Sequence, residues 1–272
     1  MRTRPLVLMV DDDVDTREMY AWSLEARGFD VLAAGTTSQG VELAQARRPD
    51  AIVTDFTLPG EDGLRLAERV RDLPGSAATP IVLVSGRAFV GDAGARASEL
   101  FDRILLKPVL PDQLIGNVTA AMLDRAAARL LRQLDAVRTR AAAVPRTSDV
   151  SQILELVSEV AADGDTPAAL VADDAAHYIG VNDAACALTG RSREELLSLH
   201  VWDLTPPRVL ADGRKAWSQF VRAGTQSGAY VLTKPSGGEV EARFAALADI
   251  LPGCHLSLLQ SVPPALLPDG GA

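Results

Sequence analysis

Short apolar runs alternate with longer mixed segments between Pro5 and Pro108. The runs are residues 6–10, 31–34, 51–54, 81–84 and 104–106. They are too continuously apolar for strands with one wet face, and they fit parallel strands that are buried on both faces. The mixed segments have helical composition and are followed by Gly28, Pro49 and Pro74, residues that commonly end a helix. The pattern predicts a doubly wound α/β domain on a parallel five-stranded sheet.

A long segment that begins at Pro111 has the composition of one extended helix. It contains no glycine after Gly116 and no proline before Pro145. Its apolar residues recur at spacings of four and three, as in the seam of a coiled coil; they are Leu123, Ala127, Leu130, Leu134, Val137 and Ala141. We therefore interpret residues 123–149 as a helical linker that pairs two chains in a homodimer. The alternative is one helix that packs on its own domain.

The pattern changes after Pro145. Residues 150–160 have the periodicity of an amphipathic helix, and the residues from 168 to about 260 alternate short strands, turns and short helices. We expect a second domain at residues 150–262. The Pro- and Gly-rich segment 263–272 is expected to be a disordered tail.

Composition and charge exclude several classes of protein. A content of 47% hydrophobic and 23% charged residues is typical of a soluble chain, and the net charge of −9 opposes a general surface for nucleic acid or anionic membranes. No segment approaches the ~20 apolar residues that span a bilayer, and the apolar run that ends before Asp11 is too short for export. Cys186 and Cys254 lie far apart without a CxxC pair, so we expect a reducing, cytoplasmic location.

Four of the apolar runs are followed directly by residues with reactive side chains. These residues are Asp11 and Asp12 after the first run, Asp55 after the third, Ser85 after the fourth and Lys107 after the fifth. In open parallel sheets, sites form beyond the carboxyl ends of the strands, so these residues should converge. Converging carboxylates repel unless a cation neutralises them, and oxygen ligands favour a hard ion such as Mg²⁺. Asp55 would then be a nucleophile for a phosphoryl group, with Lys107 and Ser85 stabilising the transferred charge.

Four motifs make residues 5 to 122 resemble the receiver domain of bacterial response regulators. They are VLMVDDD, IVTDFTLPGEDG, VLVSG and LLKP. The resemblance implies a flavodoxin-like domain over residues 1–122 in which a partner histidine kinase phosphorylates Asp55. By the same resemblance, Asp11 orders the waters of a Mg²⁺ ion, and the metal ligands are Asp12, Asp55 and the backbone carbonyl of Thr57.

One position departs from the pattern of this family. Ser85 and Lys107 match the switch hydroxyl and the invariant lysine, but the position three before the lysine, usually an aromatic residue that turns inward on activation, is Ile104. Phosphate capture needs no ring at this position. The departure therefore puts the aromatic toggle in doubt and favours transmission through backbone shifts.

The second domain resembles a PAS domain. The resemblance rests on LVADDAAHYIGVNDAACALTGRSREELL, on VWDL at 201–204 and on late strands around 228–234, 240–247 and 254–259. It implies an α+β fold with an antiparallel sheet, which in this family binds haem, flavin or small metabolites, or pairs proteins.

The residues of this domain argue against haem and flavin but identify no other ligand. No histidine lies between Thr205 and Ala223 to ligate haem iron, and the NCRFLQ-like motif of flavin photochemistry is absent. Cys186 is interpreted as a buried thiol. Six aromatic residues are interpreted as core rather than as the lining of a pocket: Tyr178, Trp202, Trp217, Phe220, Tyr230 and Phe244.

These observations favour a response regulator that relays phosphorylation of Asp55 through the helix to the PAS module. We expect no enzyme beyond self-directed phosphotransfer and autodephosphorylation, and no DNA binding, since no helix-turn-helix follows; the output would be binding to another protein. The first alternative is a PAS-based ligand-binding or dimerisation module with the receiver as scaffold. A Mg²⁺-dependent phosphatase is the third hypothesis, but such enzymes place a second aspartate two residues after the nucleophile, where this chain has Thr57.

Overall fold

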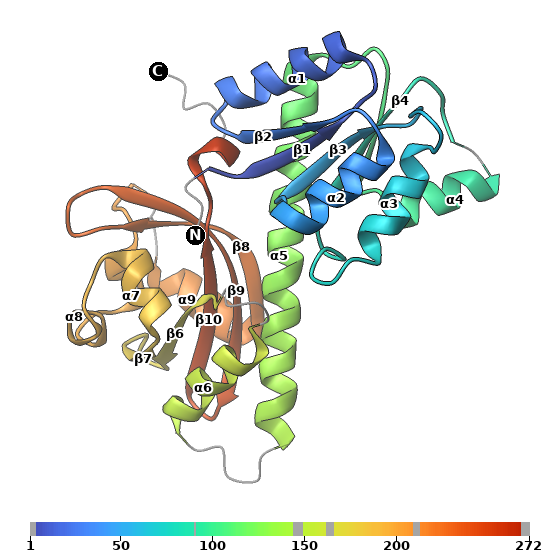
Figure 1. The fold of residues 1–272 in the computed structure, drawn as a ribbon. Coiled ribbons are helices and arrows are strands. Elements are labelled where there is room, and N and C mark those ends of the chain that lie inside the picture. The colour runs from blue at the N-terminus through green and yellow to red at the C-terminus, as the bar shows by residue number, and fades with distance from the viewer. Residues whose placement is uncertain (1–3, 90, 144–148, 162–165, 209–212, 268–272) are drawn as a thin grey trace. The chain divides into compact units, whose positions relative to one another are not determined.

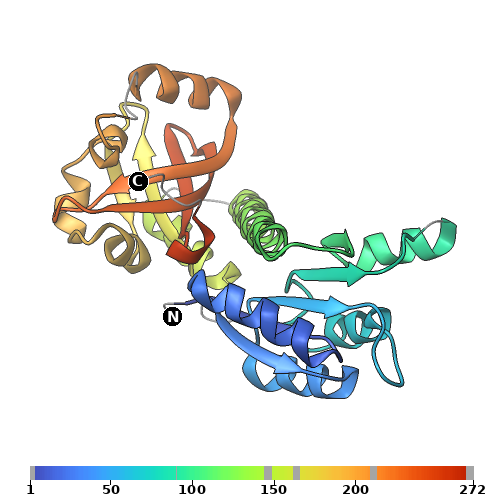
Figure 2. The ribbon, with the colours of Figure 1, turned by 90° about the horizontal axis from the view of Figure 1, so that it is seen from above.

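The computed structural model describes residues 4–89, 91–143, 149–161, 166–208 and 213–267 (Figure 1). These residues form two compact units. Unit 1 contains the described residues up to Arg125 together with those from Pro263 on, and unit 2 runs from Ala126 to Val262. Each unit is built on its own five-stranded sheet (Figure 2).

Unit 1 alternates strands and helices along the chain. Its elements are β1 (Leu6–Val10), α1 (Val14–Ala26), β2 (Asp30–Ala34), α2 (Thr37–Arg47), β3 (Ala51–Asp55), α3 (Gly63–Arg71), β4 (Ile81–Ser85), α4 (Gly91–Leu100), β5 (Arg103–Leu106) and the start of α5 (Pro111–Ala143). All strand pairs are parallel, in the order β2-β1-β3-β4-β5. The prediction of a doubly wound parallel five-stranded sheet is confirmed.

The helices of unit 1 begin where a side chain caps their free backbone N–H groups. Asp13 accepts a hydrogen bond from the N–H of Thr16, as expected for a cap of α1. Thr36 and Asp62 cap α2 and α3 in the same way. These caps fix the helix starts: two or three residues separate α1 and α2 from the strands before them, and seven separate α3 from β3.

The sheet of unit 1 is buried on both faces. On one face, Leu8, Ile52 and Leu83 pack in a cluster with α2, α3 and α4. Their chain neighbours on the strands are also fully buried. Tyr20 of α1 donates a hydrogen bond of 2.8 Å to the carbonyl of Val109, just before α5. Burial on both faces is the physical reason for the continuously apolar runs in the sequence.

Unit 2 contains a second, antiparallel sheet. After the far part of α5 come α6 (Val150–Val160), β6 (Ala168–Asp173), β7 (Tyr178–Val181), α7 (Asp183–Thr189), α8 (Arg193–Leu197), the 3₁₀ turn η2 (Val201–Leu204), α9 (Gly213–Ala223), β8 (Thr225–Thr233), β9 (Glu239–Leu251) and β10 (Cys254–Ser261). The strand order is β7-β6-β10-β9-β8. The expected second domain with an antiparallel sheet is therefore present.

The two faces of this sheet have different neighbours. Along β9, Ala245 and Leu247 belong to a cluster with α5 and α6, whereas Phe244 and Ala246 belong to clusters on the opposite face. This alternation follows from the two-residue period of a strand. Gly180 of β7 allows α6 to approach, because a Cβ atom there would lie 2.2 Å from Cγ1 of Val150.

The apolar seam of α5 is used within one chain. Leu130, Leu134, Val137 and Ala141 are all buried in the core of unit 2, among residues of α6 and the sheet. This arrangement corresponds to the alternative in which the helix packs on its own domain, and these side chains cannot at the same time form a coiled-coil seam. Residues 126–143 therefore belong to unit 2 rather than to a separate linker, residues 144–148 lie outside the described residues, and the homodimer stays a prediction without this seam.

The expectation of a disordered tail is wrong for its first five residues. Pro264–Leu266 form the 3₁₀ turn η3, and Ala265 and Leu266 are buried in unit 1. Arg27 donates a hydrogen bond to the carbonyl of Leu267, and Gly28 lies against Ala265. Prolines restrict the backbone of this segment, which lowers the entropy lost when it packs. The rest of the predicted tail, 268–272, lies outside the described residues.

Across the described ranges, none of the helices is both long enough and apolar enough for a membrane span.

Candidate functional site

The reactive residues predicted in unit 1 lie at the carboxyl end of its sheet. Asp11 follows β1, Asp55 is the last residue of β3, Ser85 is the last residue of β4 and Lys107 follows β5. The order β2-β1-β3-β4-β5 reverses direction between β1 and β3, which is the place where doubly wound sheets bind ligands. Residues that follow or end four strands therefore lie at the same edge of the sheet.

Lys107 joins the two buried carboxylates of this site. Its Nζ lies 2.6 Å from Oδ1 of Asp55 and 3.8 Å from Oδ2 of Asp11. The other oxygen of Asp55, Oδ2, accepts a hydrogen bond of 2.8 Å from the backbone N–H of Thr57. The Asp55 carboxylate is thus held at both oxygens, with a cation on one side.

Burial and neighbouring charges shift the pKa values of Asp11 and Lys107. Burial raises the pKa of Asp11, and the hydrogen bond from the N–H of Asp13 and the charge of Lys107 only partly oppose it. Burial alone would lower the pKa of Lys107, but the hydrogen bond and charge of Asp55 outweigh it, so the pKa of Lys107 is raised and the ammonium keeps its proton. Oδ2 of Asp11 is buried and accepts no hydrogen bond. Its ion pair with Lys107 is long, at 3.8 Å, so this anionic oxygen can still bind a further cation.

The other predicted site residues are placed differently. Asp12 is exposed beside Asp11, and Thr57 is exposed after β3. The hydroxyl of Ser85 is engaged with Arg87, because it donates to the Arg87 carbonyl at 2.9 Å and accepts from the Arg87 N–H at 3.1 Å. Ile104 is half-buried against the core of unit 1. The structure therefore brings Asp11, Asp55 and Lys107 together but does not turn Ser85 toward Asp55.

Sequence reasoning missed an aromatic cluster beside this site. The ring of Phe56, the residue after Asp55, meets the ring of Phe89 edge to face at 5.0 Å, and the guanidinium of Arg87 lies 4.3 Å from the Phe56 ring centre. It also missed why Gly63 starts α3: a Cβ atom there would lie 2.4 Å from the carbonyl oxygen of Asp55. The motif IVTDFTLPGEDG contains Phe56 and Gly63, but only the fold shows their contacts.

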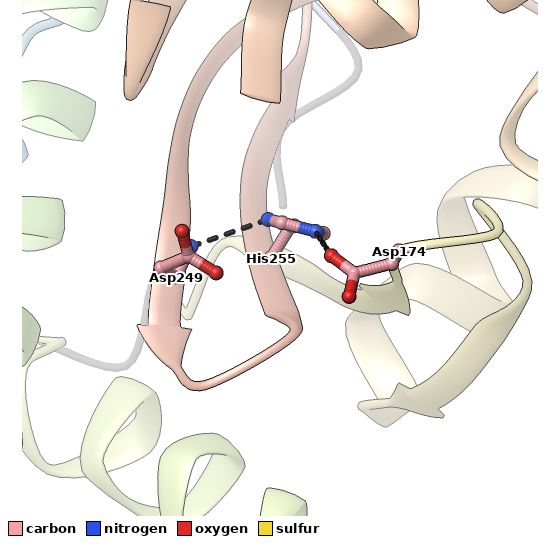
Figure 3. Close-up of side chains that lie close together, drawn as sticks. All are labelled: Asp174, Asp249 and His255. Carbon is pink, nitrogen blue, oxygen red and sulfur yellow. Dashed lines mark hydrogen bonds and ion pairs between the residues drawn. The ribbon is translucent and has the colours of Figure 1, made fainter. Parts of the chain in front are cut away.

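A second polar cluster lies in unit 2, where Asp174 and Asp249 flank His255 (Figure 3). The N–H of Asp249 donates to Nδ1 of His255 at 3.2 Å, and Nε2 lies 3.1 Å from Oδ1 of Asp174. Because Nδ1 must accept, neutral His255 carries its proton on Nε2 and donates it to Asp174. A metal at Nε2 would need the opposite tautomer, so this arrangement fits a hydrogen-bonded support better than a metal centre.

A cavity of about 280 Å³ lies on the face of the unit 2 sheet opposite α5. Its lining includes all six aromatic residues that we interpreted as core: Tyr178, Trp202, Trp217, Phe220, Tyr230 and Phe244. That interpretation was incomplete, since most of these side chains pack in core clusters and also border open space. A sequence cannot show whether packed rings leave a gap between them.

Comparisons with known proteins match the part of the chain that forms unit 1. The family model for the response regulator receiver domain matches residues 7–119. An uncharacterised 14.6 kDa protein of Leptolyngbya boryana is 35% identical over 112 residues, which are 41% of this chain and 86% of that protein. The transcriptional regulatory protein PrrA of Mycobacterium tuberculosis is 32% identical over 123 residues, and the phosphate regulon regulator PhoB of Pseudomonas aeruginosa is 30% identical over 116.

The chain spans about half the length of these two regulators, 52% of PrrA and 51% of PhoB, and the matches cover 45% and 43% of this chain. Solved structures that match include a CheY-like receiver domain from Methylobacillus flagellatus, at 32% identity over 41% of this chain and 92% of that one, with a TM-score of 0.38. A receiver domain of a Pseudomonas aeruginosa sensor histidine kinase, solved with magnesium in its active-site cleft, matches at 24% identity over 44% and 98%, with a TM-score of 0.41.

The motifs at the strand ends, the sheet order and the family match all concern the same residues. Through residues 7–119, the chain belongs to the response regulator receiver family.

Proposed function

We propose that this protein is a phosphorylation switch of a two-component system, in which Asp55 accepts a phosphoryl group from a histidine kinase. The observation that carries this proposal is the contact of 2.6 Å between Asp55 and Lys107 in a receiver domain. The switch turns over no external substrate, so the protein is not an enzyme in that sense. Its two free cysteines, Cys186 and Cys254, fit the cytoplasm where such a kinase would act.

The residues proposed to hold Mg²⁺ are Asp11, Asp12, Asp55 and the backbone carbonyl of Thr57. The buried Oδ2 of Asp11, which accepts no hydrogen bond, supports this assignment. An all-oxygen donor set with two buried carboxylates is what a hard divalent ion prefers. When bound, the ion neutralises charge on the phosphoryl oxygens during transfer.

The side chains of unit 1 supply the rest of the reaction. A carboxylate oxygen of Asp55 attacks phosphorus, the bond from phosphorus to the donor breaks, and the donor leaves with the electron pair. The N–H of Thr57 holds the carboxylate in one orientation. Lys107 keeps its positive charge beside Asp55, so it can pair with the new phosphoryl oxygens. Ser85 would leave its bonds with Arg87 to donate to the same group.

The proposed relay runs through α5, because this one helix contributes to the cores of both units. Leu114 and Val118 are buried in unit 1, and Leu130 and Leu134 are buried in unit 2. A shift of α5 would therefore disturb packing in each unit. We propose that unit 2, with its PAS-like order of strands and helices, converts this change into binding of a downstream protein, as a monomer or a homodimer.

The test is phosphorylation of the full chain by acetyl phosphate with Mg²⁺, read by intact mass. Wild type should gain one phosphoryl group, Asp55→Ala should gain none, and Asp15→Ala, which removes an exposed carboxylate from α1, should behave as wild type. Labelling of Asp55→Ala to the wild-type level would contradict the proposal.

A second candidate function, sensing of a small molecule by unit 2, is favoured by the cavity of about 280 Å³ in that unit. In that case the receiver would respond to an occupied cavity, or serve as its scaffold. The two functions share α5 and are compatible. Their discriminator is whether a cavity ligand changes the rate at which Asp55 is phosphorylated.

A further inference from the structure

We infer that the cavity of unit 2 binds an uncharged, flat and largely apolar small molecule that carries one hydrogen-bonding group, such as a phenol or an aryl ketone. This inference rests on the proposed sensing role and names the class of ligand for it. The cavity lies between the sheet, η2 and α9. Three features of the cavity define the class of ligand: an apolar wall, one polar end and a side that is held rigid.

The wall favours flat apolar ligands. It consists mainly of aromatic rings and aliphatic side chains from all five strands of the sheet and from α9. Trp217 and Phe220 meet at 5.4 Å between ring centres, and Tyr230 and Phe244 meet at 5.8 Å. Rings at these distances can extend their edge and face contacts to another ring. Since ligand pockets range upward from roughly 300 Å³, a cavity near 280 Å³ fits a molecule of about two fused rings.

The lining argues against a charged ligand. Among the described residues that border the cavity, every polar side chain is neutral: the polar ones belong to tyrosine, tryptophan, threonine, serine and glutamine. The guanidinium of Arg214 stands 5.8 Å from the ring centre of Trp202, but Arg214 is exposed and is not part of the lining. An ion that entered the cavity would lose hydration without a counter-charge in the lining, which costs far more than the transfer of a neutral group. We therefore expect the cavity to bind charged ligands much more weakly than neutral ligands of the same shape.

One end of the cavity is polar. Tyr230 and Thr205 share a hydrogen bond there, and both border the cavity. Tyr178, a residue only 7% exposed, also borders the cavity. Burial raises the pKa of both tyrosines, so each keeps its O–H. The Tyr178 hydroxyl can therefore donate a hydrogen bond to a ligand oxygen inside the cavity.

The α9 side of the cavity is held in place by the cluster of Figure 3. Nε1 of Trp217 donates to the carbonyl of Asp174 at 3.2 Å, and the Trp217 ring stands edge-on to the ring of His255 at 5.2 Å. His255 is itself fixed at both ring nitrogens. The Trp217 wall is therefore formed before a ligand arrives, which favours binding of rigid molecules.

Three probes that differ in one property test the class of ligand by calorimetry on the full chain at pH 7. They are 2-naphthol, which is neutral with a hydroxyl, naphthalene, which lacks the hydroxyl, and 2-naphthoate, which is anionic. We expect one 2-naphthol per chain and more than tenfold weaker binding of 2-naphthoate. Equal affinity for 2-naphthol and 2-naphthoate, or no binding of any probe, would overturn the inference.

Two variants locate the binding. Tyr178→Phe should weaken 2-naphthol by about three- to tenfold and leave naphthalene unchanged, because only the hydroxyl is lost. Ala229→Trp, at an exposed position of the lining, should block all probes. Tyr20→Phe removes a buried hydroxyl from unit 1 and is the matched control, with wild-type affinity expected. Wild-type binding of 2-naphthol by both Tyr178→Phe and Ala229→Trp would place the site elsewhere.

The same samples separate this inference from the proposed functions. Intact mass reports whether Asp55 is phosphorylated, and the rate with and without 2-naphthol reports sensing. If the probes bind as expected without a change in rate, the class of ligand stands and the sensing role fails. If no probe binds while Asp55 is phosphorylated, the inference fails and the switch stands.

Discussion

The pair Asp55–Lys107 in unit 1 and the pair Asp174–His255 in unit 2 each join an acid to a base, and the two pairs are buried in opposite senses. In unit 1, Asp55 is 7% exposed at its side chain and its partner Lys107 is 36% exposed. In unit 2, His255 is 1% exposed and its partner Asp174 is 76% exposed. The buried member is thus a carboxylate in unit 1 and a neutral imidazole in unit 2.

This difference distinguishes a site that can bind a cation from a cluster that supports the fold. Near Asp55, the buried Oδ2 of Asp11 still lacks a hydrogen bond, so the site has capacity for a cation. Both nitrogens of His255 already have partners, so the cluster of unit 2 has no such capacity. Changes at the unit 1 pair should therefore alter binding and phosphorylation, whereas changes to buried groups of unit 2 should first alter stability.

The largest effect is expected from Leu134→Asp in α5. An unpaired carboxylate in the core of unit 2 should lower the free energy of unfolding of that unit by about 3–5 kcal/mol. Leu131→Asp, three residues earlier and 45% exposed, should change it by under about 0.5 kcal/mol. Urea unfolding followed by circular dichroism measures both. Asp55 should remain a phosphoacceptor in Leu134→Asp, since the helix start lies in unit 1.

The same pair of variants tests the coiled-coil hypothesis. If Leu134 served pairing between chains, Leu134→Asp would give folded monomers of wild-type stability, as seen by light scattering. Loss of phosphorylation in Leu134→Asp would break the comparison, because it would show that unit 1 needs an intact unit 2.

A smaller loss is expected from His255→Ala. The ring is buried against Trp217 and Phe220, so its removal leaves a cavity. The backbone N–H of Asp249 and the carboxylate of Asp174 also lose their hydrogen-bond partner. We expect about 2–4 kcal/mol less stability for unit 2, with no change in Mg²⁺ affinity. His177→Ala, at an exposed histidine, is the control. A metal-dependent melting temperature that disappears only in His255→Ala would reverse the assignment and make this cluster a metal site.

The fold of unit 1 could be predicted because its strands are buried on both faces. The run 6–10 corresponds to β1, and 104–106 differs from β5 only by Arg103. The residues at the strand ends were found for the same reason: parallel topology places them together without any side-chain detail.

Contacts between distant segments that the parallel topology does not dictate could not be predicted. Asp174 and His255 are separated by 81 positions, and no periodicity links them. The spacing of Leu130 and Leu134 showed that one face of α5 is buried, but a second chain and the sheet of unit 2 would bury it equally well. The missing hydrogen bond at Asp11 Oδ2 and the gap among the aromatic rings depend on atomic positions, which no residue pattern records.

The smallest effect concerns Asp11 and is the finest test of the comparison. Burial raises the pKa of Asp11, so the ionised form is less favourable in the folded state than in the unfolded chain. Asp11→Asn should therefore raise stability by about 1 kcal/mol in EDTA at pH 7, the order of the cost of one unpaired buried group. The gain should shrink as the pH falls through the raised pKa of Asp11 and vanish below its ordinary value, where both side chains are neutral.

Mg²⁺ should reverse the order of stability, so that wild type becomes more stable than Asp11→Asn. At ten times its Kd the ion should stabilise wild type by about 1.4 kcal/mol, because it binds only the folded state. Asp11→Asn should respond much less, while Asp174→Asn, which alters the exposed acid of unit 2, should respond as wild type. Melting temperatures with EDTA and with Mg²⁺ give all three comparisons. An undiminished Mg²⁺ response of Asp11→Asn, or a lost response of Asp174→Asn, would show that the orphaned oxygen of Asp11 is not where the cation binds.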